Sequence, residues 1–402
     1  MPIRTGIGVS RLPESYQAGR EAARIALSQS SSEDSTLLLV FSSARYSPEA
    51  LLRGIRTITR SGILVGCTTA GEITSQGPSH KSVVVVAITN PDMAYGVGLG
   101  QNISHNARAA GYEAGREAKL MLDQRFKGSH PLRRHFLLML SEGLKGNCAE
   151  TVRGLQNVMG NSFPIVGGSA GDDLHFVQTH QFLEDKVLSD SVVCLLVAGN
   201  ISVGIGARHG WKPLGKPKTV TQSSSNTIEK IDDRPAVSVY DDYFGDKARE
   251  LRSQSLTRMA LLYPLGLSVP DETEYLVRNA MRVQANGAVV CGAEVPQGSE
   301  VRLMMGTKTS AITAARQAAQ EAKKNLGKAS PKLALIFESA SRHQLLGRRA
   351  EEELEIVQKV IGAGVPLAGF YTYGEQAPLK AIRHMGQTHF HNESIVVVLL
   401  GE

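Results

Sequence analysis

The sequence predicts an α/β fold in which repeated strand–helix–strand units form mixed sheets covered by helices, with a β-rich segment at about residues 200–300. Two observations predict this class. Apolar strands alternate with amphipathic helices, and the alternation recurs three times along the chain. Runs of Val, Leu and Ile without polar interruption are typical of strands that are buried on both faces of a sheet.

The three repeats share one order of elements. In each, an apolar strand leads through an amphipathic helix to a second strand that ends in a glycine-containing turn. The copies run from "TLLLVFSS" to "ILVGCTTAGEI", from "HFLLMLSEG" to "PIVGGSAGDD", and from "LALIFESA" to "PLAGFYTYGEQ". A strand that begins with serine follows each copy: "SVVVVAI", "SVVCLLV" and "SIVVVLL". We expect right-handed crossovers between the parallel strands.

An upstream half of the unit recurs as well. "TGIGVS" and "YGVGLG" each lead into a helix that contains "AGREA", and "LMMGTKTSAITAARQAAQEAKKN" is interpreted as a looser third copy. The first two stretches resemble a dinucleotide-binding fingerprint. Both lack its third glycine, and no acid stands convincingly about 20 residues further on, so NAD binding is not favoured.

Between the second and third copies lies the β-rich segment. A short helix is expected within residues 232–245, and strands are expected within 274–283, 287–295 and 300–306. We predict two domains, one of residues 1–210 with two repeat units and one of residues 211–402 with the β-rich segment and the third unit.

Composition narrows the classes of function. Hydrophobic residues make up 42% and charged residues 20%, as in a globular protein. The net charge is +6, but lysines and arginines do not cluster among aromatic residues, which disfavours nucleic-acid binding. The four cysteines are scattered, and no stretch approaches the roughly 18 apolar residues of a membrane span. We therefore expect a cytoplasmic protein without disulfides or a membrane anchor, and leave open whether it forms a homo-oligomer.

"PIVGGSAGDD" matches the G-x-S-x-G pattern of a hydrolase nucleophile at Ser169. That chemistry needs a helix directly after the serine, whereas "FVQTHQFL" alternates like a strand. What the sister turns share is a first glycine, a hydroxyl, a second glycine that we expect at positive φ, and an acid. A buried turn and a ligand-lining turn, formed by Gly167, Gly168, Ser169 and Asp172, both remain open, with the Ser169 hydrolase as the alternative from another class.

Other candidate ligand-binding residues lie later in the chain. "RHGW" places His209 and Trp211 just after a strand, either as a ligand platform or as an anchor between domains. Arg342 follows one strand of the third copy, and Tyr371, Tyr373 and Glu375 follow the next. These ends share one edge of a parallel sheet, so the group either clamps a carboxylate or zwitterionic ligand or forms an Arg–Glu ion pair.

At these residues the chain resembles the FIST family. "VGCTTAGEI", "GGSAGDD" and "HGWKPLGKPKTVT" resemble the FIST N-terminal domain, and "ESASRHQLLGRRAEEELEIV", "GFYTYGE" and "HNESIVVVLL" resemble the FIST C-terminal domain. The resemblance implies a sensory protein of bacterial-type signal transduction that binds an amino acid or a similar small molecule. It also implies a sensor histidine kinase or a cyclic-di-GMP enzyme as partner.

A subset of the family, the NosP group, binds haem b and responds to nitric oxide. This alternative would need an axial ligand, for which His209, His175 and His180 are the candidates. Our leading hypothesis is a non-catalytic sensor of a small ligand that regulates a partner signalling enzyme, with the haem sensor, the hydrolase and a scaffold without ligand as alternatives.

Overall fold

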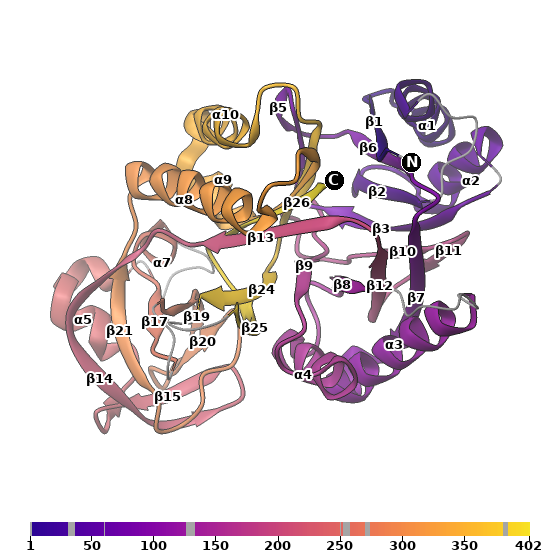
Figure 1. Ribbon diagram of the computed structural model, residues 1–402. Helices are drawn as coiled ribbons and strands as arrows, with labels where there is room; N and C mark the ends of the chain where they lie inside the picture. The colour runs from indigo at the N-terminus through magenta and orange to yellow at the C-terminus, as the bar shows by residue number, and fades with distance from the viewer. Residues whose placement is uncertain are drawn as a thin grey trace.

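The structure is a computed structural model that describes residues 2–30, 37–59, 61–125, 133–249, 251, 258–269, 274–380 and 385–402. Three units surround a common centre, and a β-rich insert lies against the third unit (Figure 1). The fold is of the predicted mixed α/β class, with several mixed sheets and a β-rich segment.

The first unit comprises β1 (Arg4–Ser10), α1 (Ser15–Ser30), β2 (Leu37–Ser43), α2 (Pro48–Ile58), β3 (Ile63–Thr69), β4 (Glu72–Thr74), β5 (Gly77–Ser79) and β6 (Val83–Thr89). The second comprises β7 (Met93–Gln101), α3 (Ile103–Arg125), β8 (Arg134–Ser141), α4 (Cys148–Met159), β9 (Ile165–Ser169), β10 (Gln181–Leu183), β11 (Lys186–Leu188) and β12 (Ser191–Gly199). The third comprises β13 (Ser202–Arg208), α8 (Lys308–Leu326), β22 (Pro331–Ser339), α9 (Ala340–Leu346), η2 (Gly347–Arg349), α10 (Ala350–Ile361), β23 (Leu367–Thr372), β24 (Glu375–Lys380), β25 (Met385–His391) and β26 (Ile395–Gly401).

The insert separates β13 from α8. It comprises β14 (Lys212–Ser224), β15 (Thr227–Ile231), β16 (Arg234–Pro235), α5 (Ser238–Phe244), η1 (Gly245–Arg249), α7 (Arg258–Leu262), β17 (Leu265–Leu267), β18 (Leu276–Arg278), β19 (Ala280–Val283), β20 (Val289–Cys291) and β21 (Glu300–Met305). Its strands form an antiparallel sheet in the order β18-β17-β21-β14-β15-β20-β19, and its side chains form a separate hydrophobic core.

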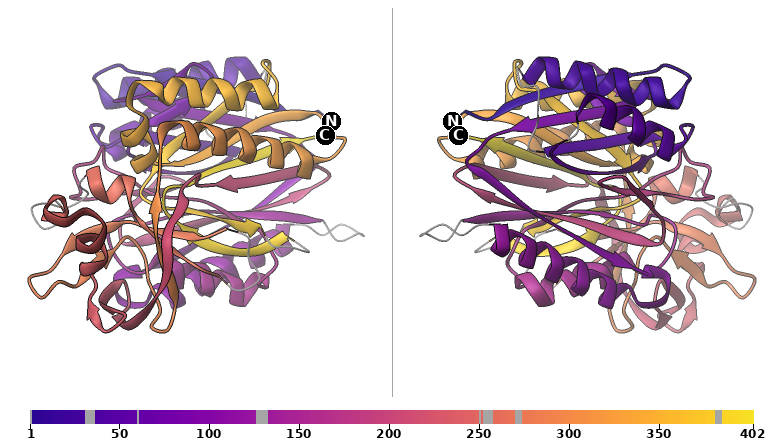
Figure 2. Two further views of the ribbon diagram at one scale, coloured as in Figure 1. Left: turned by 90° about the vertical axis from the view of Figure 1, so that its left-hand side faces the viewer. Right: turned by 90° about the vertical axis from the view of Figure 1, so that its right-hand side faces the viewer.

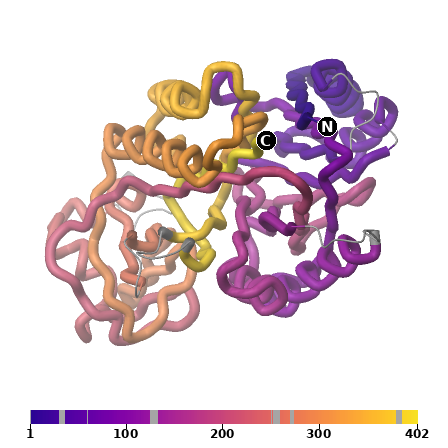
Figure 3. Tube along the Cα trace, in the orientation of Figure 1, coloured from indigo at the N-terminus to yellow at the C-terminus, as the bar shows by residue number. Residues whose placement is uncertain are grey.

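The units exchange hairpins in a closed cycle. In the first unit β1 pairs with β6, β6 pairs with β2, and β2 pairs in parallel with β3. The second unit has the same order with β7, β12, β8 and β9, and the third has it with β13, β26, β22 and β23. The hairpin that follows joins another unit's sheet: β10 pairs with β3, β24 with β9, and β4 with β23. The cycle gives the molecule an approximate threefold arrangement and brings N- and C-termini close together (Figure 3).

The inner faces of the three sheets share one hydrophobic core, to which each unit contributes strand residues such as Phe41, Leu138 and Phe370. The outer faces pack on helices: α1 and α2 on the first sheet, α3 and α4 on the second, α8 and α10 on the third. Figure 2 shows these helices outside the layers of strands. The strands with uninterrupted apolar runs, such as β2, β6, β12 and β26, are thus buried on both faces, as those runs predict.

The glycine pairs of "TGIGVS" and "YGVGLG" serve helix packing. A Cβ on Gly8 would lie 1.8 Å from Ala22 O, and a Cβ on Gly98 would lie 1.9 Å from Ala114 O. The third copy of this strand is "SVGIGAR" in β13, where a Cβ on Gly206 would lie 2.1 Å from a carbonyl oxygen of α8. "LMMG", interpreted as that copy, instead ends β21 of the insert, because about 100 residues separate β13 from its helix.

Candidate functional site

The three glycine-containing turns meet one another near the centre of the molecule. Ala70 N donates to Tyr371 O at 3.0 Å, Gly171 N donates to Thr68 O at 3.0 Å, and Ser169 N donates to Gly374 O at 2.8 Å. Each turn is therefore held by both of the others. Main-chain hydrogen bonds of this kind require close backbone approach, which explains the glycines in each copy.

The glycines of the three turns do not share one conformation. Gly167 has φ 140°, and a Cβ there would lie 2.1 Å from Met139 O. A Cβ on Gly168 would lie 2.3 Å from the side chain of Thr372. Of the second glycines, Gly71 adopts a positive φ of 130°, whereas Gly171 and Gly374 do not. The prediction of positive φ at all three second glycines is therefore wrong. Close packing, which leaves no room for a Cβ, explains more of the glycines in these turns than positive φ does.

Ser169 is at the end of β9 and 1% exposed. Its hydroxyl lies 3.0 Å from Ser141 Oγ and 3.6 Å from Cys148 Sγ, and it accepts a 3.4 Å hydrogen bond from Gln376. No helix follows within residues 170–180. Hydroxyl, thiol and amide groups are poor general bases at neutral pH, so these contacts do not activate Ser169 as a nucleophile.

Asp172 organises the loop after β9. Its carboxylate accepts hydrogen bonds from the backbone N–H groups of Phe176, Val177 and Gln178, at 2.9, 2.6 and 3.0 Å. The hydroxyl of Tyr373 donates to the same carboxylate at 2.5 Å. Asp172 thus fixes a loop and does not face a cavity as a free acceptor.

Arg342, expected as a clamp or an ion-pair partner, is fully buried. Its guanidinium donates to the carbonyl oxygens of His209, Ala311 and Glu393 and to the carboxylate of Glu353. These contacts join α9 to α8, α10 and the segment after β13. They leave the guanidinium enclosed by protein, and it does not line the cavity described below.

His209 and Trp211 lie at the junction between the third unit and the insert. Trp211 N donates to His209 Nδ1 at 2.9 Å, and the indole N–H donates to Leu261 O at 3.1 Å. Burial lowers the pKa of His209 to about 3, assisted by the positive charges of Arg342 and Arg208. His209 is therefore neutral, and both side chains hold the two parts of the chain together.

Tyr371 and Glu375 are also enclosed. The ring of Tyr371 lies 4.3 Å from that of His343, and its hydroxyl is buried without a hydrogen-bond partner. Glu375 accepts hydrogen bonds from Thr372 Oγ1 at 2.5 Å and Ser394 N at 3.0 Å. Burial raises the pKa of Glu375 to about 8. The polar set of the third copy thus does not converge on an open site.

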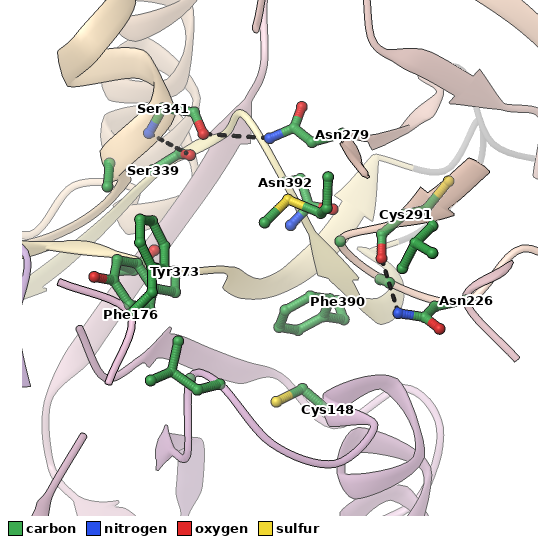
Figure 4. Close-up of a pocket in the computed structure, with 18 of the residues that line it drawn as sticks. Cys148, Phe176, Asn226, Asn279, Cys291, Ser339, Ser341, Tyr373, Phe390 and Asn392 are labelled. Carbon is green, nitrogen blue, oxygen red and sulfur yellow. Dashed lines mark hydrogen bonds between the residues drawn. The ribbon is translucent and has the colours of Figure 1, made fainter. Parts of the chain in front are cut away.

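A cavity of about 750 Å³ lies where the second unit, the third unit and the insert meet. Figure 4 shows Tyr373 and Phe176 on one side, Phe390 and Cys148 below, and Asn226 and Cys291 on another side. Of the predicted ligand-binding residues, only Tyr373 lines it. The loop after β8, the start of α9 and the insert supply most of the wall.

Two aromatic side chains of the cavity wall stack on each other. Phe176 stacks on Tyr373 with ring centroids 5.0 Å apart and planes 17° apart. Cys148 and Cys291 also line the cavity, and burial raises the pKa of both thiols, that of Cys291 to about 12. Both thiols are therefore protonated, and neither is an activated nucleophile.

The cavity wall contains residues that sequence reasoning did not single out: Cys148, Phe176, Asn226, Asn279, Phe390 and Asn392. Asn392 belongs to the "HN" that precedes the last strand, which is one of the most specific parts of the family resemblance. The sequence therefore contained a motif that could have pointed to Asn392 as a site residue. Asn226 and Asn279 lie in the insert, far from the motifs in sequence, and nothing in their local pattern marks them.

None of His175, His180 and His209, the histidines expected as axial ligands of a haem, lines this cavity. His175 is exposed, and Nδ1 of His209 accepts a hydrogen bond from Trp211 N. Across the described residues, no group of three or more His, Cys, Asp and Glu side chains could hold a metal ion.

The threefold α/β fold and the cavity at strand ends define an α/β protein able to enclose a small molecule. The chain belongs to the FIST family: the FIST N domain matches residues 36–234, and the FIST C domain matches residues 236–378. FIST domains are sensory domains that bind small ligands.

Among curated proteins, an uncharacterized protein of Mycobacterium tuberculosis is 24% identical over 388 residues, covering 94% of this chain and 95% of the relative. An uncharacterized protein of Methanocaldococcus jannaschii is 26% identical over 152 residues, covering 36% of this chain and 29% of the relative.

Among solved structures, one of a cyanuric acid hydrolase has a TM-score of 0.33 at 9% identity and covers 99% of this chain and 100% of that one. Thermotoga maritima PurL complexed with FGAR has a TM-score of 0.23 at 10% identity and covers 99% of this chain and 72% of that one. Scores this low bear neither on fold nor on function. In the described part of the chain, no helix is long and apolar enough to cross a membrane.

Proposed function

We propose that this protein is a non-catalytic sensor that binds a small, organic ligand in the cavity between the second unit, the third unit and the insert. The observation that carries the proposal is the cavity itself, whose volume of about 750 Å³ lies within the range of small-molecule sites. Its wall combines aromatic rings and protonated thiols with carboxamides, and it lies at the ends of β8, β22 and β23.

The loop after β9 supports a sensory role. Asp173, Leu174 and Phe176 have positive φ of 54°, 66° and 56°, a strained conformation for residues other than glycine. Leu174 and Phe176 line the cavity, and Val177 is 77% exposed. A ligand that contacts this loop would shift the balance between its conformations and thereby alter an exposed surface. A histidine kinase or a cyclic-di-GMP enzyme is the proposed reader of that change.

Blocking the cavity tests the proposal. Met281 lines the cavity, so Met281→Trp would fill it, whereas Met305 is 40% exposed on β21 and offers a matched control. We expect metabolites that raise the melting temperature of the wild-type protein to lose this effect with Met281→Trp and to keep it with Met305→Trp. Equal binding to both variants, or an esterase activity that Ser169→Ala abolishes, would contradict the proposal.

A further inference from the structure

The charges and hydrogen-bonding groups of the cavity define the class of its ligand. We infer that the cavity takes an uncharged, flat molecule with adjacent amide-type N–H and C=O groups, such as a neutral nitrogen heterocycle. This inference rests on the proposed function, because it names the ligand class of the same cavity. It differs from the amino-acid ligand that the family resemblance implies.

Charged side chains are scarce in the cavity wall. Among the residues that the structure describes, the wall contains one lysine, Lys145, which is exposed, and one carboxylate, Glu294. Glu294 accepts two hydrogen bonds from the guanidinium of Arg153 and one from Asn147. Burial acts to raise the pKa of Glu294, but the hydrogen bonds from Arg153 and Asn147 and the positive charges of Arg153 and Arg278 together outweigh it and lower the pKa, so the carboxylate stays ionised and paired.

An amino acid would need partners for its two charges, and the cation that lines the described wall, Lys145, is exposed. Its carboxylate requires a cation or several N–H donors when it leaves water, and an unpaired charge is costly to bury. Arg342, the cation expected from the sequence, is enclosed by backbone carbonyls and Glu353. Asn147 already caps the N-terminus of α4, accepting from Ala149 N at 3.1 Å. The interior of the cavity therefore favours a molecule without net charge at either end.

Carboxamides supply the polar part of the wall. Asn226, Asn279 and Asn392 line it, and the hydroxyls of Ser339 and Ser341 lie beside Asn279 (Figure 4). Asn279 donates to Ser341 Oγ at 3.2 Å, and Asn226 donates to Cys291 O at 2.9 Å. A carboxamide pairs with the N–H and C=O edge of another amide through two hydrogen bonds, the geometry used to read nucleobases.

Two of these carboxamides are incompletely paired. Asn279 and Asn392 are 4% and 5% exposed, and the amide oxygen of each is buried without a hydrogen-bond donor. An unmet buried acceptor is destabilising. The last torsion of an asparagine turns easily, so either group can present its oxygen to a ligand N–H. A ligand amide would supply the missing donor.

The remaining wall suits a flat apolar face. The Phe176–Tyr373 pair borders one side, and Phe390, which is 5% exposed, borders the floor with Cys148. Aromatic side chains stack on heterocyclic rings regardless of the ring substituents, while the carboxamides read the edge. Stacking and edge recognition together select a neutral heterocycle over an aliphatic zwitterion.

Two pairs of probes test the ligand class with the full-length protein. Uracil and its 6-carboxylate, orotate, differ by one charge, as do nicotinamide and nicotinate. We expect calorimetry to detect saturable binding of the uncharged member of at least one pair, with a Kd at least ten-fold lower than that of its carboxylate. Asn392→Leu should raise that Kd at least ten-fold, and Asn161→Leu, an exposed position after α4, should leave it unchanged.

The outcomes separate the ligand class from the existence of the site. If orotate, nicotinate or phenylalanine binds as tightly as the uncharged probes and Met281→Trp blocks it, the cavity is the site and the inferred class is wrong. If no uncharged probe binds, the inferred class is also wrong. If no metabolite of any class binds in a manner that Met281→Trp prevents, the proposed function itself fails. Ser341→Ala gives a second variant should Asn392→Leu not fold.

Discussion

The hydroxyl of Tyr373 donates a 2.5 Å hydrogen bond to the carboxylate of Asp172, joining the turn of the third unit to the loop after β9. The same hydroxyl accepts from Leu174 N at 2.9 Å. Tyr373, which lines the cavity, is thereby connected to the strained loop after β9, in which Val177 is exposed.

Removing that hydroxyl should loosen the loop without emptying the cavity. Tyr373→Phe keeps the ring that stacks on Phe176 but leaves Leu174 N and one carboxylate oxygen of Asp172 short of a partner. We expect a loss of about 1–3 kcal/mol in the free energy of unfolding. Hydrogen exchange, followed by mass spectrometry, should become faster in residues 172–178. Tyr112→Phe, at an exposed tyrosine of α3, should change neither, and unaltered exchange in Tyr373→Phe would refute the connection.

The buried pair of Arg342 and Glu353 should be structural. Both side chains are completely inaccessible, so Arg342→Met would leave an unpaired carboxylate and should cost about 3–5 kcal/mol in urea unfolding. Arg342→Met combined with Glu353→Leu should be more stable than Arg342→Met alone, because Glu353 is then no longer left as an unpaired carboxylate. Strict additivity of the two single effects would contradict this account. A stable Arg342→Met protein that had lost ligand binding alone would restore Arg342 as a ligand clamp.

Glu72 predicts a dependence of stability on pH. Burial raises the pKa of this carboxyl to about 8, against the opposing effect of hydrogen bonds from Ser82 and Thr69. The native state therefore holds a proton that the unfolded chain has released above pH 4.5. Its contribution to stability is present below pH 4.5 and is lost as the pH rises towards 8.

Glu72→Gln should remove that dependence, because glutamine resembles the protonated acid at every pH. Between pH 5 and pH 8 we expect the wild-type free energy of unfolding to fall by about 1.4 kcal/mol per pH unit relative to the variant. Urea unfolding across this range measures the difference. Glu355→Gln, on the exposed face of α10, should behave as the wild type, and parallel curves for Glu72→Gln and wild type would refute the raised pKa.

Local sequence pattern was sufficient to predict the α/β class and the three repeated units. Uninterrupted runs such as "VVVVAI" predict strands buried on both faces because any other position would expose them to water. The short helix predicted within residues 232–245 is present as α5, which ends locally at its C-cap, Gly245. The third copy of the upstream strand, "SVGIGAR" in β13, was not predicted from the sequence, because its helix α8 follows only after the insert.

The cavity, in contrast, was decided by tertiary structure. Asn279 and Asn392 are 113 positions apart, and the insert must fold back on the ends of β22 and β25 before both can border one space. The roles of Asp172 and Arg342 depend in the same way on distant backbone groups that accept or donate hydrogen bonds. Sequence alone determined which segments are buried, because burial follows from local apolar pattern. Only the tertiary structure decided which polar side chains are consumed by the fold and which remain for a ligand, because hydrogen-bond partners are set by long-range contacts.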